Sequence, residues 1–373
     1  MIYFDYSATT PVNKKVLDKF VNDSLNYVGN SNSPHKLGKI NNDYVLDCSE
    51  RINQLLNLNN EYDIIYTSGS SESNNLAIKG FLNKYPNAHI ITTRFEHSSV
   101  IAPIASFQRK GYIASFVDIN EYGLIDLKAL ESLISESLVD NRPTLISIAS
   151  VNSELGIKEP IEDISKLVQK YDNVYFHCDA TQSIGKVNIN FESVDFISFS
   201  AHKFYGIKGI GVLLKKKSVK IDTLINGGKS TTKFRSGTPA HPLIGSITYA
   251  LELALSNLDE NYKKVKELNE YFISKTKDNI VLNSNEYSIP HILNISLLNK
   301  SSIDVVMKLS EKDIFISNTS ACSSDKNLST AVMALTNDEK RASSSIRISI
   351  SHLNSKEEVD ILIAEIKKII NEE

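Results

Sequence analysis

Cysteine is scarce in this 373-residue chain, and its three copies, Cys48, Cys178 and Cys322, are odd in number and far apart. That spacing disfavours a disulfide framework or a zinc site, so no metal is expected and a reducing compartment fits best. An excess of charge of one sign is lacking too. The formal net charge of -3 gives no reason to expect binding to nucleic acid or to an anionic membrane, and the short basic run at 215–217 is interpreted as a solvated strand end.

Long apolar runs and export signals are also missing. No stretch approaches the ~20 apolar residues of a membrane-spanning helix, and the N-terminus, MIYFDYSATTPV, lacks a basic start and an apolar core. We therefore expect a cytoplasmic protein without a membrane segment. The composition is otherwise that of a globular protein, with 41% hydrophobic residues to fill one large and one smaller domain.

Strand-like apolar runs alternate with helix-like segments through the first two-thirds of the chain. The strand-like runs lie at 63–66, 89–93, 112–119, 144–151, 173–180 and 194–200. Among the helices between them, one is predicted to end near Gly111, one to begin at Asp126 and one to open at Pro160. This alternation is typical of βαβ units. It predicts an α/β fold in which a mostly parallel central sheet has helices on both faces.

The pattern changes near Ser256. A long helical segment at 257–279 is followed by short strand-like runs at 291–298, 314–317 and 345–351, and then by a helix whose capping box is Ser355 to Glu358. We therefore predict a large cofactor-binding domain at 15–255 and a smaller α+β domain formed by 1–14 and 256–373.

Polar residues follow the strand-like runs, at the sheet edge where open α/β sheets bind ligands. These residues are Ser70, Ser71, His97, Asn152, Asp179 and Lys203. Ser70 and Ser71 suit a phosphate at a helix N-terminus. Asp179 would keep a proton on a pyridine nitrogen, His97 would stack on the ring, and Lys203 would bond to an aldehyde. The set predicts a site for pyridoxal phosphate.

Each of these signals has a simpler interpretation when it stands alone. TSGSSES, at 67–73, reads as a polar loop. Asp179 reads as a strand-end cap, His97 as a helix cap and Lys203 as a surface lysine. Their recurrence at successive strand ends favours the shared cofactor site.

Ten longer motifs run in order along the chain. They are YFDYSATTPV at 3–12, GNSNSPHKLG at 29–38, YTSGSSESNNLAIKG at 66–80, EHSSV at 96–100, VNSELG at 151–156, CDATQSIGK at 178–186, SFSAHKFYGIKGIG at 198–211, RSGTP at 235–239, SACSS at 320–324 and SSIRIS at 344–349. With these motifs the chain resembles, over nearly its whole length, the cysteine desulfurases of the NifS/IscS type. That family belongs to class V of the fold-type I pyridoxal-phosphate enzymes.

The resemblance implies a homodimer that binds pyridoxal phosphate. Lys203 would carry the cofactor, Asp179 would pair with its ring nitrogen, and His97 would stack on the ring and shuttle protons. The other cofactor positions it implies are Asn152 and Gln182 at the ring hydroxyl, Ser70, Ser71, Ser200 and His202 at the phosphate, and Thr238 reaching across from the second subunit.

The resemblance also implies L-cysteine as substrate. Arg347 would hold its carboxylate with a bidentate guanidinium, and Asn32 or His35 would lie near that end. Cys322 would take up the sulfur as a persulfide, and its setting, SNTSACSSDKNLS, is small and polar, as suits a thiol that moves between partners. A sulfur-acceptor protein follows, either an iron–sulfur cluster scaffold or an enzyme that thiolates tRNA or a cofactor.

Two departures from the family pattern leave details open. Residues 30–33 read NSNS in place of the usual Asn-Pro-Ser-Ser, and the sequence stops at Glu373 without the longer tail by which some relatives dock a scaffold. Other class V activities, selenocysteine lyase or an aminotransferase, are the alternatives, and Cys322 argues against the aminotransferase. A degenerate cofactor-binding protein is a further alternative, which the intact set of site residues disfavours.

Overall fold

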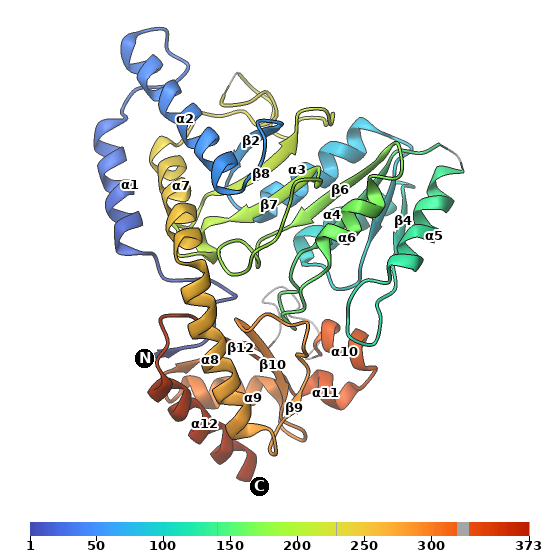
Figure 1. Ribbon diagram of the computed structural model, residues 1–373, viewed down its shortest axis with the longest axis vertical. Coiled ribbons are helices and arrows are strands. Elements are labelled where there is room, and N and C mark those ends of the chain that lie inside the picture. The colour runs from blue at the N-terminus through green and yellow to red at the C-terminus, as the bar shows by residue number, and fades with distance from the viewer. Residues whose placement is uncertain (140, 229, 319–327, 373) are drawn as a thin grey trace.

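A seven-stranded sheet dominates the computed structural model, which describes residues 1–139, 141–228, 230–318 and 328–372 (Figure 1). Its strand order is β2-β8-β7-β6-β5-β3-β4. Strand β8 is antiparallel to both neighbours, and the others run in one direction, which confirms the mostly parallel sheet. The strands are β2 (Tyr62–Thr67), β3 (His89–Thr92), β4 (Ile113–Phe116), β5 (Thr144–Ala149), β6 (Val174–Asp179), β7 (Phe196–Ser200) and β8 (Gly211–Lys216).

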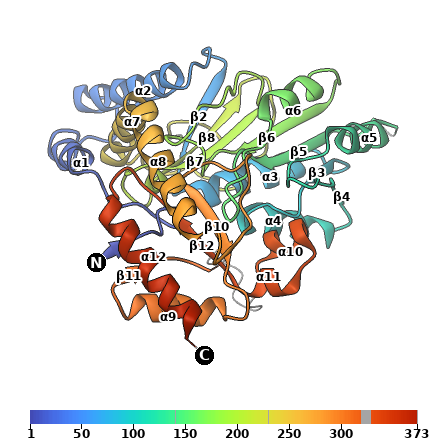
Figure 2. The same cartoon turned by 60° about the horizontal axis from the view of Figure 1, so that its bottom comes forward.

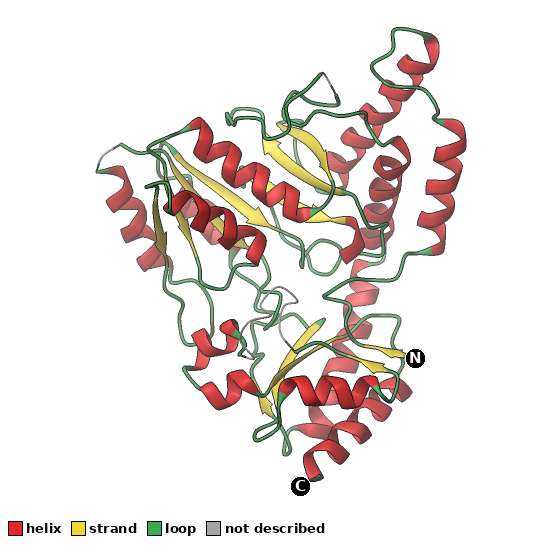
Figure 3. Ribbon diagram, turned by 180° about the vertical axis from the view of Figure 1, so that it is seen from behind, coloured by secondary structure: helices red, strands yellow, loops and turns green. Residues whose placement is uncertain are grey.

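Helices cover both faces of this sheet, as predicted (Figure 3). Because side chains alternate along a strand, Ile64 and Tyr66 of β2 pack into one core with α2, α5, α6 and α7, whereas Ile65 packs into another with α3 and α4. The helices of this part are α1 (Lys14–Asn26), α2 (Lys36–Leu55), α3 (Ser70–Lys84), α4 (Ser98–Gln108), α5 (Leu127–Leu138), α6 (Ile161–Val168) and α7 (His241–Ser256).

Local signals fix where several helices begin and end. Asp126 caps α5 by accepting hydrogen bonds from the backbone N–H groups of Lys128 and Ala129, and Pro160 stands at the N-cap of α6. Helix α4 ends at Gln108, and Gly111 then turns the chain with a φ of +91°, which glycine adopts without strain. The predicted starts of α5 and α6 are confirmed.

A second group of strands and helices lies at the end of the molecule where both termini are found (Figure 2). β10 (Ile292–Ser296) pairs antiparallel with β12 (Ser345–Ser349) and with β9 (Val281–Leu282), and β1 (Ile2–Tyr3) pairs parallel with β11 (Ile314–Phe315). Phe4 shares a core with residues between 265 and 369, which supports the predicted division into domains, although that division stays a prediction. The helices here are α8 (Leu258–Thr276), α9 (Ser302–Ser310), α10 (Thr330–Thr336), α11 (Glu339–Ser343) and α12 (Lys356–Asn371), and α12 starts with the predicted capping box.

The basic run at 215–217 is not a solvated strand end throughout, so the interpretation from sequence was wrong for Lys215. Its side chain is fully buried at the end of β8, with Nζ 2.9 Å from Asp63 Oδ2. Nζ also donates to the carbonyl oxygens of Lys216 and Val219 and lies 4.6 Å from the Phe234 ring centroid. A buried ammonium is tolerated here because an opposite charge and carbonyl oxygens surround it.

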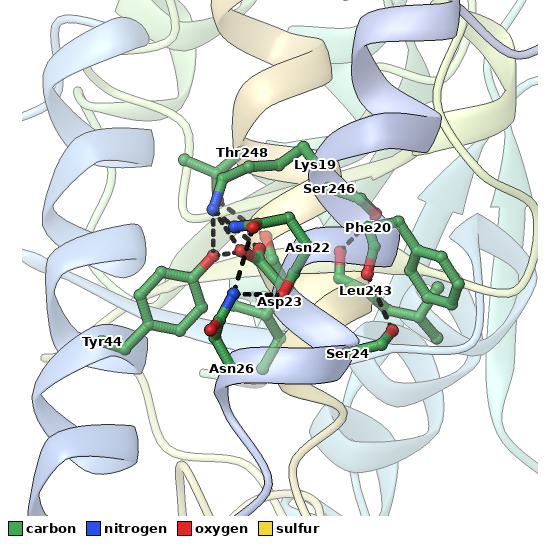
Figure 4. Close-up of polar contacts among 11 residues, drawn as sticks. Lys19, Phe20, Asn22, Asp23, Ser24, Asn26, Tyr44, Leu243, Ser246 and Thr248 are labelled. Carbon is green, nitrogen blue, oxygen red and sulfur yellow. Dashed lines mark hydrogen bonds and ion pairs between the residues drawn. The ribbon is translucent and has the colours of Figure 1, made fainter.

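A polar cluster around the buried Asp23 joins α1 and α2 where α7 passes them (Figure 4). We call it the α1–α2 cluster and define it by Lys19, Asp23 and Tyr44. Lys19 Nζ donates to Asp23 Oδ1 at 2.6 Å and to Tyr44 Oη at 2.8 Å, and Tyr44 Oη donates to Asp23 Oδ2. A side chain on Gly245 of α7 would collide with this pair, so the helix approaches only because that position has none. Among the described residues, no helix is long and apolar enough to cross a membrane.

Candidate active site

A cavity of about 270 Å³ lies between the carboxyl ends of the large sheet's strands and β12. The topology gathers its residues from distant segments: Asp179 ends β6, Lys203 follows β7, and Arg347 lies on β12. This is the sheet edge at which α/β proteins bind ligands. The predicted site residues that line it are Ser70, Ser71, His97, Asp179, Gln182, His202, Lys203 and Arg347.

Lys203 reaches the cavity because a short 3₁₀ turn, Ala201–Lys203, follows β7 directly. Its Nζ donates to the carbonyl oxygens of Ser7 at 2.6 Å and Ala8 at 2.8 Å. The N-terminal segment is itself held in place, because the backbone N–H and hydroxyl of Thr10 both donate to the His202 carbonyl. The amine is therefore fixed at the cavity wall by backbone carbonyls.

Asp179 is buried, and both of its carboxylate oxygens are held. Oδ2 accepts a hydrogen bond from Asn74 Nδ2 at 2.7 Å, while Oδ1 accepts from the backbone N–H of Thr181 at 3.0 Å and from the Thr181 hydroxyl. A carboxylate fixed in this way keeps its charge at one place on the cavity wall. It is suited to hold a proton on a ligand's ring nitrogen.

His97 is the N-cap of α4, and its ring also lines the cavity. Nδ1 accepts a hydrogen bond from the backbone N–H of Ser99 at 3.1 Å. Burial lowers the pKa of His97 below 6.5, and the Asp179 carboxylate offsets part of that effect. The neutral imidazole is therefore favoured near neutral pH.

Beside Ser70 and Ser71, the cavity adjoins a hollow of about 460 Å³. Ser70 and Ser71 begin α3, whose dipole favours an anion, and they line both spaces together with His202. Ser200 lines only the hollow. The backbone turn at Gly69 fits closely here, because a side chain on Gly211 would lie 2.6 Å from the Gly69 Cα.

Arg347 is buried on β12, and two contacts fix its guanidinium. Nη1 donates to the Ser153 carbonyl and Nη2 to Asp5 Oδ1, each at 3.0 Å. Nε makes no hydrogen bond within the described part of the chain. Since arginine stays charged, the cavity has a fixed cation that suits a carboxylate.

Five predicted residues do not line this cavity in their own chain. Asn152 is buried beside it, but its amide donates to the Phe95 carbonyl and accepts from the backbone N–H groups of Glu154 and Leu155, so it shapes the loop after β5. Ser200 lies in the adjoining hollow. Thr238 is exposed and lines a separate hollow of about 100 Å³ beside Gly209. Its predicted role across a subunit interface is not tested by one chain.

Asn32 and His35 are the other two, and both are exposed in the connection between α1 and α2. His35 caps α2 by accepting a hydrogen bond from the backbone N–H of Gly38 at 3.2 Å. The structure therefore does not place either residue near Arg347 of the same chain. Cys322 lies outside the described residues.

Several residues that build the site were missed in the sequence. Ser7 and Ala8 act through backbone carbonyls, which carry no side-chain signal, and the Asp5–Arg347 contact spans 342 positions. Asn74 could have been found, because it lies one helical turn after Ser70 and so shares a face of α3 with it. Ser99 follows His97 by two positions, and an N-cap side chain commonly accepts a hydrogen bond from the backbone N–H at that position.

The fold and the cavity together define an enzyme of fold-type I, with a lysine, a carboxylate and an imidazole arranged around one ligand space. Residues 2–362 match the family model described as aminotransferase class-V. The chain therefore belongs to the class V aminotransferases, a family of pyridoxal-phosphate enzymes, and cysteine desulfurases are among its full-length relatives.

Three relatives illustrate the likeness. A cysteine desulfurase IscS from Buchnera aphidicola subsp. Baizongia pistaciae is 37% identical over 99% of this chain and 93% of its own length. A solved structure described as a NifS-like protein is 32% identical, covers 99% of both chains and has a TM-score of 0.91. A structure described as SspA in complex with cysteine is 30% identical, with a TM-score of 0.81 over 95% of this chain and 100% of its own.

Proposed function

We propose that the protein is a cysteine desulfurase that converts L-cysteine to L-alanine and retains the sulfur as a persulfide on Cys322. The observation that carries this proposal is the meeting of Lys203, Asp179, His97 and Arg347 at one cavity. An amino acid that reacts on pyridoxal phosphate needs an amine, a partner for the ring nitrogen, a flat ring and an anchor for its carboxylate. The cavity offers each of them.

The residues present fit pyridoxal phosphate, which when bound supplies an electron sink for negative charge at the substrate's α-carbon. Lys203 would bond to its aldehyde and Asp179 would keep a proton on its ring nitrogen. Ser70 and Ser71, at the N-terminus of α3, would hold the phosphate, and the adjoining hollow gives that group room. The cavity is thus polar at the positions where the cofactor is polar.

The contacts of Lys203 also suit a base. A neutral amine has two N–H groups that can donate to the Ser7 and Ala8 carbonyls, so these contacts would hold the nitrogen in place while it acts as a base toward the substrate. Arg347, fixed by Asp5 and Ser153, would hold the substrate carboxylate and so determine which substrate atom faces that nitrogen.

The flanks of the segment that contains Cys322 are anchored beside the cavity. The backbone of Ser317 pairs with that of Arg347, at 3.2 Å and 2.6 Å, and the Ser329 hydroxyl donates to Glu154 Oε2 at 2.6 Å. Cys322 is five residues from Ser317, a length that extends up to about 18 Å. This anchoring supports a thiol that can reach a substrate bound at Arg347.

The other two cysteines are poor candidates for the nucleophile. Both are buried, and burial raises the pKa of the Cys48 and Cys178 thiols. Since attack on sulfur requires a thiolate, their environments disfavour this chemistry. Cys322 is the remaining cysteine of the chain.

The proposed reaction balances without another reactant. The Cβ–S bond of L-cysteine breaks, its sulfur bonds to Cys322 Sγ, and a proton replaces it on Cβ to give L-alanine. The persulfide would then pass to an acceptor protein for iron–sulfur cluster assembly or for thiolation of tRNA or a cofactor. The homodimer, the contribution of Thr238 to the neighbouring site and the cytoplasmic location stay predictions.

The test is replacement of Cys322 by serine. In an assay that contains a thiol reductant to release the persulfide sulfur as sulfide, we expect formation of alanine and sulfide from L-cysteine to fall by on the order of 10²-fold or more, because a hydroxyl is a poor nucleophile toward sulfur. L-Cysteine should still change the visible spectrum, since its binding needs Lys203 and Arg347 and not the thiol. Cys48→Ser and Cys178→Ser are the controls and should keep the activity of the parent protein.

Alanine production at the parental rate by Cys322→Ser would refute the desulfurase proposal. Assaying the same variant with L-selenocysteine separates the main alternative, because a selenocysteine lyase would keep its activity without this thiol. Capture of the persulfide-loaded protein's partner from native extract would then identify the acceptor.

A further inference from the structure

Asn74 lies fully buried on α3, between Asp179 and Ser99. Its Nδ2 is 2.7 Å from Asp179 Oδ2 and 2.9 Å from Ser99 Oγ. A carboxylate oxygen accepts hydrogen bonds, so the amide nitrogen must face it. Oδ1 of Asn74 is consequently left without a hydrogen bond in the described part of the chain. The two nitrogen contacts therefore fix the amide, which donates to both neighbours.

Ser99 Oγ accepts one of these hydrogen bonds, and its own hydroxyl group donates another. Because Ser99 Oγ accepts from Asn74, its hydroxyl hydrogen is directed to the other close polar atom, His97 Nδ1, at 2.8 Å. The backbone N–H of Ser99 also lies 3.1 Å from Nδ1, and an N–H can only donate. His97 Nδ1 thus accepts from both groups and carries no proton.

We propose that Ser99 is a positioning residue that holds His97 as the neutral tautomer with its proton on Nε2. His97 then meets the ligand as a hydrogen-bond donor through Nε2. Nε2, at the opposite edge of the ring, makes no hydrogen bond to the described residues, and His97 lines the cavity. Such a donor can steady a negatively charged oxygen or sulfur atom. The ligand's identity, but not the tautomer, rests on the function proposed above.

The charged groups around His97 come from several elements. Asp179 and Glu154 favour the imidazolium, Lys203 and Arg347 oppose it, and burial lowers the pKa of the ring. The Ser99 hydroxyl acts in the same direction as burial, because it bonds to the neutral ring. Removing that hydroxyl should therefore raise the pKa of His97, while the charges stay as they are.

The experiment follows the ring nitrogens of His97 by ¹⁵N NMR in the holoenzyme labelled at histidine, with His97→Gln to identify its signals. In the parent protein we expect an unprotonated Nδ1 and a protonated Nε2 across neutral pH. Ser99→Ala should shift the titration of His97 upward by about 0.5–1 pH unit. Ser99→Thr keeps the hydroxyl and should titrate like the parent, as should the matched control Ser98→Ala in the same helical turn.

A parental His97 that carries its proton on Nδ1, or that is doubly protonated at neutral pH, would overturn the proposal. So would a Ser99→Ala protein whose His97 titrates with the parent. These readings need no turnover, so they stand apart from the alanine assay: a protein without desulfurase activity can still show the tautomer, and an active one can fail to.

Discussion

The α1–α2 cluster and the polar groups around the cavity both combine carboxylates with cationic side chains. They differ in whether all of their hydrogen-bonding groups have partners within the protein. In the cluster, both oxygens of buried Asp23 are taken up by Lys19 and Tyr44 (Figure 4). At the cavity, Arg347 Nε has no hydrogen-bond partner among the described residues. A cluster that closes on itself stabilises the fold, whereas one that surrounds an open space is arranged for a ligand. Mutations should separate the two roles.

The largest effect is expected at Lys203. Under the proposed function, replacing it by alanine should lower desulfurase activity by on the order of 10³-fold or more, because the amine would both bond the cofactor and act as the base. The visible absorbance of the protein-bound cofactor should disappear. The urea midpoint of the protein without cofactor should hardly move, because Lys203 contacts carbonyls at a cavity wall. If Lys203→Ala regained the lysine-bound absorbance on adding cofactor, this lysine would not be the attachment site.

The reverse result is expected at Asp23. Asp23→Ala should lower the free energy of unfolding by about 2–4 kcal/mol, because Tyr44 and Lys19 lose their shared acceptor next to α7. Cofactor absorbance and turnover per folded molecule should be unchanged. Asp18→Ala is the matched control on the same helix, since the Lys14–Asp18 pair is exposed and should contribute within about 0.5 kcal/mol. Equal urea midpoints for the two variants would contradict the stabilising role of the cluster.

The smallest effect is expected at Glu96, which precedes His97 in the sequence. Its carboxylate accepts hydrogen bonds from the Thr93 hydroxyl and from the backbone N–H of Ala149, so it resembles the α1–α2 cluster more than the cavity. Burial raises the pKa of Glu96 from 4.5 to about 8. The folded state then binds this proton more tightly than the unfolded state, so the stabilisation is complete below pH 4.5 and is lost as the pH rises toward 8. Glu96→Gln should flatten that decline in urea midpoints, and an unchanged slope would show that Glu96 is ionised in the folded protein.

His97 and Asp179 show how far the sequence could lead. The sequence was compatible with a capping role and with a cofactor-binding role for each residue. In the structure His97 caps α4, Asp179 accepts a hydrogen bond from the backbone N–H of Thr181, and both residues also line the cavity. The strand-end rule placed them correctly because parallel strands end at one edge of the sheet. Whether they bind the cofactor is a question of ligand contacts, which a pattern in one chain does not contain.

The features that the sequence could not predict depend on contacts between distant segments. A basic run looks solvated by composition, and only the pairing of β8 with β2 brings Lys215 next to Asp63. Likewise, His35 stands in a family motif, yet its position within one chain is set by its place as the N-cap at the start of α2. Local signals such as the Ser355 capping box were reliable because all of their partners lie within one helical turn.

The contacts of the N-terminal segment make completion of the cavity depend on the order in which the chain is synthesised. Ser7 is synthesised early, but its partner Lys203 lies 196 residues further along the chain. Asp5 and its partner Arg347 are separated by 342 residues. The nascent chain can pair the strands of its large sheet before β12 exists. Lys203 and Arg347 therefore meet at one cavity only after β12 has been made, when translation is nearly finished.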